Sequence, residues 1–346
     1  MLRRLSAFAL SIFLLLFFSS CRGGKADNAD KTILYHLDSE PDTLDPQIAS
    51  GEPAITAVQA LFEGLVRLGE GEKPYPGVAE SWDSDAKGTS FTFHLRADAE
   101  WSDGTPVTAD DFVFAFQRAL NPVTGSSTCE RMFCIRNARS IHSGSKPPES
   151  LGVTAKDSRT LLVELEYPVS EFPKWTASAV FMPCNRKFFE STEGRYGLDK
   201  KDLLGNGPFE IDGKYGWERE KYMNLRRSPS YHGERTPLPE AVDFNFDSKS
   251  EDYADPVAAL TSGKTDAARV PFSRTGDAEA AGCVLTSFED TTWGLCFNLK
   301  SPLFQNEKIR RAFLQSFSRA SVLKYLPKNA SPAENILLPS AEIDGK

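Results

Sequence analysis

Hydrophobic and polar residues alternate along several short segments of the chain, a pattern typical of β-strands with one buried face. The segments predicted as strands are residues 32–37, 91–95, 159–165, 209–211, 223–226, 241–246 and 293–299. A hairpin turn at Lys87-Gly88 is predicted to precede the strand 91–95. No repeat of fixed period is visible along the chain.

Other segments carry apolar residues every three or four positions, which predicts helices with one buried face. The predicted helices cover residues 54–65, 108–120 and 255–260, and a further helix is expected to begin at Asn306. In that last helix, Ile309, Phe313, Leu314 and Phe317 are expected to face one side. Short helical turns are predicted at residues 172–175 and 185–189.

The densest stretch of the chain, residues 101–120, holds Asp103, Asp110 and Asp111 and raises the question of a metal or catalytic site. Thr108 stands three residues before Asp111, the spacing of a capping box at a helix start. Acidic residues in the first turn also complement the positive end of the helix dipole. Asp103 is followed by glycine, as in a turn. We therefore interpret these aspartates as scaffold.

The composition indicates a soluble globular chain after its first 20 residues. The 346 residues are 40% hydrophobic and 25% charged, with a formal net charge of -8. This length is sufficient for two or three domains. An acidic chain is a poor candidate for nucleic-acid binding, which needs a basic face.

The N-terminus has the features of a secretory signal. Arg3 and Arg4 precede an uncharged, mostly apolar run over residues 6–18, and small residues follow before Cys21. Residues 18–21 resemble a bacterial lipobox, in which the cysteine is lipidated and becomes the new N-terminus. We predict a signal peptide over residues 1–20 and a lipidated, flexible tether over residues 21–31. The alternative is an ordinary signal peptide in which Cys21 stands by chance.

The cysteines leave two questions open. Five remain besides Cys21, an odd number that cannot pair completely within one chain. Cys129 and Cys134 are close enough in sequence for a local disulfide, but the residues alone do not decide whether they are bonded. Cys296 lies in the predicted strand 293–299, so we interpret it as a small core residue.

Two short motifs are better explained by ordinary structure. Residues 258–265 approach a phosphate-binding loop, but alanine replaces the first glycine and the helix comes first, so Gly263 is interpreted as a helix cap. Asp83 and Asp85 suggest a calcium loop whose remaining ligand positions fail. The four histidines lack metal-ligand spacing, and no catalytic motif is found. No catalytic residue, metal or cofactor is therefore predicted.

Several blocks occur in a characteristic order along the chain. They are Glu40-Pro-Asp-Thr-Leu-Asp-Pro46, Leu61-Phe-Glu-Gly-Leu65, the stretch from Trp101 to Phe112, Asn206-Gly-Pro-Phe209, and Arg226-Arg-Ser-Pro-Ser-Tyr231. Together they resemble the family 5 solute-binding proteins, the peptide, dipeptide and nickel receptors of ABC importers. The oligopeptide-binding branch is the closest match. The resemblance covers about residues 32–340, and the ordered set is more specific than any single motif.

The resemblance implies an α/β fold, of the type II periplasmic-binding-protein-like class, with two lobes and an additional domain. Lobe I would contain residues 32–62 and 178–291, and the additional domain residues 63–177. Residues 292–346 would begin lobe II. Ligand would be enclosed between the lobes by hinge closure.

Family members continue well beyond the position of Leu337-Leu-Pro339, so the resemblance implies a truncated chain with an incomplete lobe II. The apolar faces around Phe313 and Phe317 would then be poorly covered. The acidic residue that meets a peptide's amino terminus would fall in the missing portion, which would compromise ligand capture by this chain. A non-functional product of an interrupted gene is an alternative interpretation.

The resemblance also implies a set of ligand-binding positions. Residues 50–52 match a strand that pairs with the peptide main chain, a contact that tolerates many side chains. Arg269 matches a ligand-facing position at which a cation can meet a carboxylate. Residues 291–293 resemble the crossover strand between the lobes. The resulting predicted ligand-binding residues are Ser50, Gly51, Glu52, Arg269, Thr292 and Trp293.

The predicted function is that of a substrate-binding lipoprotein, which captures peptides outside the membrane for an ABC importer and performs no covalent chemistry. Its expected partners are a peptide, a membrane permease and the lipid anchor on Cys21, and the chain is expected to be a monomer without nucleic-acid partners. The alternatives are a binding protein for a nickel-chelate, heme, a sugar or a signalling peptide. A secreted hydrolase is a further alternative from another class.

Overall fold

A computed structural model of the protein describes residues 32–69, 73–233, 239–286, 296–316, 318, 321–322 and 324. By its internal contacts the chain divides into two compact units, Met1–Arg269 and Val270–Lys346. The first unit contains all the sheets described below, and the second contains short helices.

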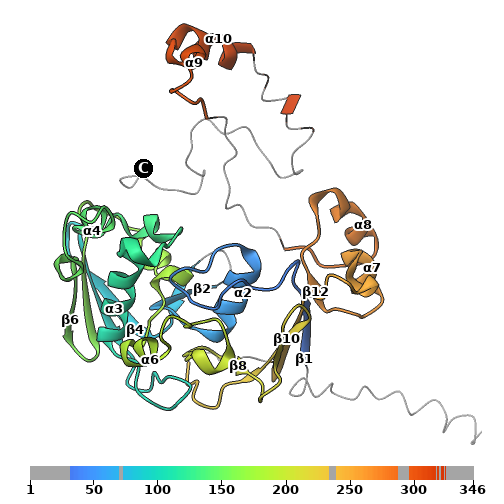
Figure 1. The fold of residues 1–346 in the computed structure, drawn as a ribbon, viewed down its shortest axis with the longest axis horizontal. Coiled ribbons are helices and arrows are strands. Elements are labelled where there is room, and N and C mark those ends of the chain that lie inside the picture. Colours follow the sequence, from blue (N-terminus) through green and yellow to red (C-terminus); the bar gives the residue numbers. More distant parts are fainter. Residues whose placement is uncertain are drawn as a thin grey trace, which may run out of the picture. The chain divides into compact units, whose positions relative to one another are not determined.

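The largest sheet brings together strands from both ends of the first unit (Figure 1). Its order is β12-β1-β11-β10-β8, and β9 pairs with β10. The strands are β1 (Thr32–His36), β8 (Phe209–Ile211), β9 (Trp217–Glu218), β10 (Tyr222–Arg227), β11 (Ala241–Asn245) and β12 (Ala267–Ala268). β1 runs parallel to β11 and to β12, whereas β10 is antiparallel to its neighbours. The register aligns Tyr35 with Phe244 and Phe244 with Met223.

Helix α2 (Glu52–Leu61) contacts β8 of this sheet and contributes to the core. Its buried residues Val58 and Leu61 belong to the same apolar cluster as Met223 and Phe244. The helix begins at Glu52 and ends at Leu61, so the predicted helix over 54–65 is shifted toward the N-terminus. Gly51 precedes it with a φ of 80°, a left-handed conformation that suits glycine.

A second sheet is entirely antiparallel, with the order β4-β5-β7-β6. Its strands are β4 (Ala79–Ser84), β5 (Ser90–Leu95), β6 (Val153–Asp157) and β7 (Thr160–Glu164), and a separate ribbon pairs β2 (Val66–Leu68) with β3 (Pro74–Pro76). Helix α3 (Ala109–Leu120) packs against β6 and β7 (Figure 1). Phe112 and Phe116 of α3 are fully buried in this part of the core, where Phe116 stacks edge-on against Phe181.

The remaining helices are short. They are α4 (Ala138–His142), α5 (Phe172–Trp175), α6 (Arg186–Ser191) and α7 (Pro256–Thr261) in the first unit, and α8 (Thr275–Ala280), α9 (Pro302–Gln305) and α10 (Glu307–Ser316) in the second. Single 3-10 turns occur at Pro122–Thr124, Cys129–Met132, Pro148–Ser150, Ala179–Phe181, Lys200–Asp202, Glu251–Tyr253 and Phe272–Arg274. None of the helices within the described ranges has the length and apolar character needed to cross a membrane.

The start of α3 confirms the scaffold interpretation of the acidic stretch. The backbone N–H of Thr108 donates to Asp111 Oδ2 at 2.8 Å, which is one half of the predicted capping box. Asp103 Oδ1 accepts the backbone N–H of Thr105 at 2.9 Å and thereby closes a turn. Two of the three aspartates are thus occupied in local backbone contacts.

The structure also confirms that the two short motifs, at residues 83–88 and 258–265, are a hairpin turn and a helix cap. Asp85 Oδ1 accepts the backbone N–H groups of Thr89 and Ser90, as expected for a hairpin turn. Gly263 follows α7 with a φ of 72°, as expected for a helix cap.

The structure answers one open question about the cysteines and contradicts one prediction. Cys129 and Cys134 are both free, buried thiols, so the open question of a local disulfide is answered against it. Cys296 is exposed, so its interpretation as a core residue is wrong. Residues 296–299 form no strand. The earlier part of the predicted strand, residues 293–295, lies outside the described residues.

Helix α10 confirms the predicted start and the exposed apolar face. Asn306 Oδ1 accepts the backbone N–H of Lys308 at 2.9 Å, which caps the helix. Phe313 packs edge-on against Phe297 but remains 44% exposed. Phe317 lies outside the described residues.

Candidate ligand-binding site

The parallel strands of the largest sheet bring two charged residues, the predicted Arg269 and its neighbour Asp38, to one edge. In open α/β sheets, ligands bind beyond the carboxyl ends of parallel strands. Asp38 follows β1, and Arg269 directly follows β12. Because His36 is in register with Ala268, the segments that follow β1 and β12 leave the sheet side by side. Arg269 Nη1 lies 3.8 Å from Asp38 Oδ2, and their side chains are 66% and 53% exposed.

Tyr35 connects this ion pair to the start of α2. Burial raises the pKa of the Tyr35 phenol, the carboxylates of Glu52 and Asp38 raise it further, and the Arg269 guanidinium opposes them. Both carboxylates and the guanidinium therefore act on one phenol from nearby. We call Tyr35, Asp38, Glu52 and Arg269 the β1-edge cluster. It combines two anions, one cation and a hydroxyl in a partly exposed position.

The predicted residues 50–52 lie at the start of α2 and form no strand in the structure. Gly51 is the residue before the helix, and its carbonyl accepts the backbone N–H of Ile55 at 3.1 Å. Glu52 Oε1 accepts the Thr56 hydroxyl at 3.2 Å. Ser50 and Gly51 are exposed, so their backbone remains reachable from solvent. Their role in peptide binding stays a prediction.

Of the predicted residues, Arg269 lies beside Asp38, and both Glu52 and Arg269 act electrostatically on Tyr35. From the sequence, Tyr35 is predicted only as part of the strand 32–37, and Asp38 is given no role. The one signal in the sequence that could have indicated Asp38 as a site residue is its position directly after the first predicted strand. Thr292, Trp293 and Cys21 lie outside the described residues.

His36 lies next to the cluster, and its ring is partly buried. Its ring stacks on Tyr253 with centroids 4.7 Å apart and planes 5° from parallel. Burial lowers the pKa of His36, while Asp38 acts in the opposite direction. A small cavity of about 200 Å³ lies beside Tyr35, Tyr253 and Asn245.

Three of the sequence blocks that carried the resemblance meet at a buried carboxylate with a structural role. Glu63 accepts the Tyr231 hydroxyl at 2.6 Å and lies 3.1 Å from both Arg96 Nη2 and Arg67 Nε. The side chain of Asn206 accepts the N–H of Glu63 and donates to its carbonyl. Burial raises the pKa of Glu63 despite these partners. These contacts tie three separate blocks together and leave no free ligand-binding group on Glu63.

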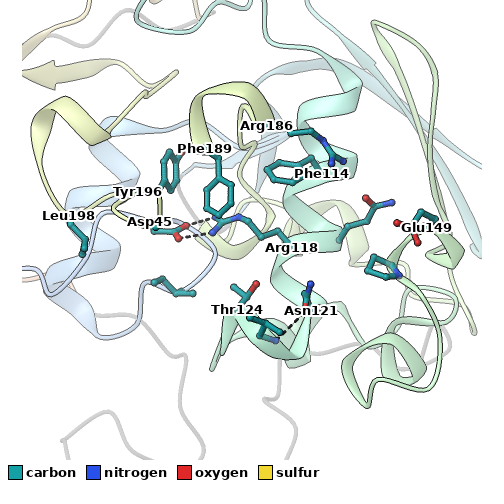
Figure 2. A pocket seen from close by; sticks show the side chains of 15 residues that line it. Asp45, Phe114, Arg118, Asn121, Thr124, Glu149, Arg186, Phe189, Tyr196 and Leu198 are labelled. Atoms are coloured by element: carbon teal, nitrogen blue, oxygen red, sulfur yellow. Dashed lines mark hydrogen bonds and ion pairs between the residues drawn. The ribbon is translucent and has the colours of Figure 1, made fainter. Parts of the chain in front are cut away.

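A cavity of about 640 Å³ lies elsewhere in the first unit (Figure 2). Its lining includes Asp45, Phe114, Arg118, Arg186 and Phe189. It shares no residue with the β1-edge cluster. Among the residues that the structure describes, no group of three histidine, cysteine, aspartate or glutamate side chains is arranged to hold a metal ion.

Comparison with known proteins identifies a family and several relatives. The model of the bacterial extracellular solute-binding proteins, family 5, matches residues 73–343. The dipeptide-binding protein DppE of Bacillus subtilis is 30% identical over 326 residues, which cover 93% of this chain and 59% of that protein.

Solved structures agree with this assignment. OppA of Burkholderia pseudomallei matches with a TM-score of 0.67 and 30% identity, over 74% of this chain and 49% of that one. OppA of Haemophilus influenzae, in complex with RPPGFSPFR, matches with a TM-score of 0.71 and 27% identity, over 87% and 58%.

The likeness to these structures confirms the predicted α/β fold of the type II periplasmic binding proteins. The chain spans between 49% and 59% of the length of the three relatives described above. Since the family model matches most of the chain, the chain belongs to the bacterial extracellular solute-binding proteins of family 5.

Proposed function

We propose that the protein captures peptides outside the cytoplasmic membrane and delivers them to the permease of an ABC importer. The names of the relatives support this proposal, because one is a dipeptide-binding protein and the other two are OppA proteins, one of them solved with RPPGFSPFR. The observation that carries it is the β1-edge cluster, which places Arg269 beside Asp38 at the carboxyl edge of parallel strands.

The chemistry of the cluster suits a peptide. The long, exposed ion pair between Arg269 and Asp38 costs little to open, because surface ion pairs contribute only ~0–1 kcal/mol. Arg269 is then available to a ligand carboxylate, and Asp38 or Glu52 to an ammonium group. The exposed backbone of residues 50–51 adds groups that recognise a main chain without regard to side chains. Binding requires no covalent step.

The proposed arrangement of the whole protein follows the family resemblance. Residues 32–62 and 178–291 would form lobe I, residues 63–177 the additional domain, and residues 292–346 the start of lobe II. Thr292 and Trp293 would then lie at the lobe junction. A signal peptide over residues 1–20 and a lipid on Cys21 would hold a monomeric protein at the outer face of the membrane.

Isothermal titration of the protein with a mixture of short peptides tests this function. We expect exothermic binding to peptides with free termini and weaker binding once the termini are acetylated and amidated. Equal binding of blocked and free peptides would contradict the assignment of the β1-edge cluster, and no binding to either set would contradict peptide capture by this chain.

The lipid anchor has a separate test. Radiolabelled palmitate is expected to be incorporated into the protein in bacteria and not into a Cys21→Ser variant. Incorporation into that variant would contradict lipidation at Cys21.

A further inference from the structure

The cavity of about 640 Å³ has the size and the wall of a small-molecule site (Figure 2). Ligand pockets commonly have volumes of ~300–1,000 Å³ and are lined by aromatic and apolar side chains. Phe114 and Phe189 meet edge-on with ring centroids 5.6 Å apart, and Phe189 and Tyr196 do so at 5.5 Å. The three rings form a continuous aromatic wall.

One pair of charges in this cavity is already neutralised. Arg118 donates to both carboxylate oxygens of Asp45, at 2.7 and 2.5 Å. The Arg118 guanidinium also lies 4.5 Å from the centre of the Phe189 ring. Both side chains are buried. This pair therefore shapes the cavity without offering a free charge to a ligand.

Two further residues of opposite charge, Arg186 and Glu149, line the same cavity, and neither forms an ion pair with a described residue. The guanidinium of Arg186 lies 4.3 Å from the centre of the Phe114 ring, and no carboxylate within the described part of the chain pairs with it. Glu149 and Gln117 also line the cavity, and neither side chain has a hydrogen-bond partner among the described residues. Figure 2 shows Arg186 beside Phe114 and Glu149 on a separate segment.

We propose that this cavity binds a small zwitterion with an apolar or aromatic side chain, of the amino-acid or dipeptide class. Two carboxylates and two guanidinium groups line it, so the cavity attracts neither anions nor cations as a class. A ligand carboxylate would pair with Arg186, its ammonium group with Glu149, and its side chain would lie against Phe114 and Phe189. This site is separate from the β1-edge cluster and does not rest on the proposed function.

Methyl NMR spectroscopy of the isotope-labelled protein provides a local test. Ile48 and Leu198 line the cavity and report on binding there. Leu34 lies in β1, does not line the cavity and serves as the reference signal. We expect titration with phenylalanyl-alanine to shift the methyl signals of Ile48 and Leu198. Blocking either terminus should weaken this binding about tenfold or more, because a charge-assisted contact is lost. Equal binding of the doubly blocked dipeptide would overturn the proposal.

Matched variants separate this site from the β1-edge cluster. Arg186→Gln and Glu149→Gln change exposed side chains, so both proteins should fold, and each should weaken the Ile48 and Leu198 response about tenfold. Lys187→Gln, an exposed neighbour that does not line the cavity, should leave the response unchanged. Arg269→Gln should also leave it unchanged, whether or not the proposed function holds. An unaltered response in both Arg186→Gln and Glu149→Gln would overturn the proposal.

Discussion

Arg118 in helix α3 binds both carboxylate oxygens of Asp45, which lies 73 residues earlier in the chain. The same guanidinium donates to Gln47 and packs against Phe189, and the Gln47 side chain donates to the carbonyl of Met182 at 2.8 Å. The pair therefore attaches the loop after β1 to α3 and to the segment around Met182.

Asp45→Ala is expected to destabilise the protein by about 3–5 kcal/mol, because it leaves the buried Arg118 charge without its counterion. Urea denaturation followed by tryptophan fluorescence measures this loss. Arg136→Gln serves as the control, since the Arg136–Glu164 pair is partly exposed and should contribute no more than about 1 kcal/mol. Similar losses in both variants would contradict the structural role of the buried pair.

Gly207→Ala should destabilise the protein by about 3 kcal/mol through overpacking. A Cβ at this position would lie 2.4 Å from the backbone nitrogen of Phe62 and 2.8 Å from the carbonyl oxygen of Leu61, and neither backbone atom can move aside easily. Thermal unfolding measures the effect.

Gly125→Ala is the matched control for Gly207→Ala. Gly125 has a φ of 68° with open space around it, so alanine there meets only backbone strain of about 1–2 kcal/mol. If both substitutions had equal effects, the close approach of Gly207 to the end of α2 would not be the cause.

Native labelling with iodoacetamide at pH 8 should modify Cys296 rapidly and leave Cys134 and Cys184 protected. Burial raises the pKa of both protected thiols from 9.0 to about 12, which leaves about a thousandfold less reactive thiolate at this pH. Mass spectrometry of the digested protein identifies the labelled positions. After denaturation without reductant, Cys129 and Cys134 should also react with iodoacetamide. If only these two cysteines stayed unlabelled, a disulfide between them would be indicated.

The same raised pKa values predict a loss of stability at alkaline pH. The folded protein retains the protons of Cys134 and Cys184 more tightly than the unfolded chain, whose ordinary thiol pKa is 9.0. Their contribution is therefore fully present below pH 9 and is lost as the pH rises toward about 12. The free energy of unfolding of a Cys134→Ala, Cys184→Ala double variant should fall less steeply over this range, and an unchanged slope would contradict the assignment.

Arg269→Gln should weaken binding of peptides with a free carboxyl terminus about tenfold, since one charge-assisted contact is removed. It should have little effect on peptides whose carboxyl terminus is amidated. Isothermal titration with matched peptide pairs measures the difference. Lys264→Gln is the control, because Lys264 is also exposed and pairs with Asp252 at 3.4 Å. Equal effects of the two substitutions would point to general electrostatics.

Features governed by neighbours along the chain could be predicted from the sequence alone. The alternation over residues 91–95 corresponds to β5, and the helical period after Thr108 corresponds to α3 with its Thr108–Asp111 contact. These patterns were sufficient because strand alternation, helix periodicity and capping each depend on residues at most a few positions apart. The ordered blocks likewise indicated the family that the comparison confirmed.

The tertiary structure alone decided which distant residues meet. Asp38 approaches Arg269 because the parallel register of β1 and β12 aligns their ends, and no local pattern encodes that pairing. The exposure of Cys296 was predicted wrongly because burial depends on whether another part of the chain covers a segment. The same reason applies to the cavity beside Arg186. Its wall combines side chains from segments that become neighbours only when the chain folds, because side-chain contacts across a core are independent of separation in sequence.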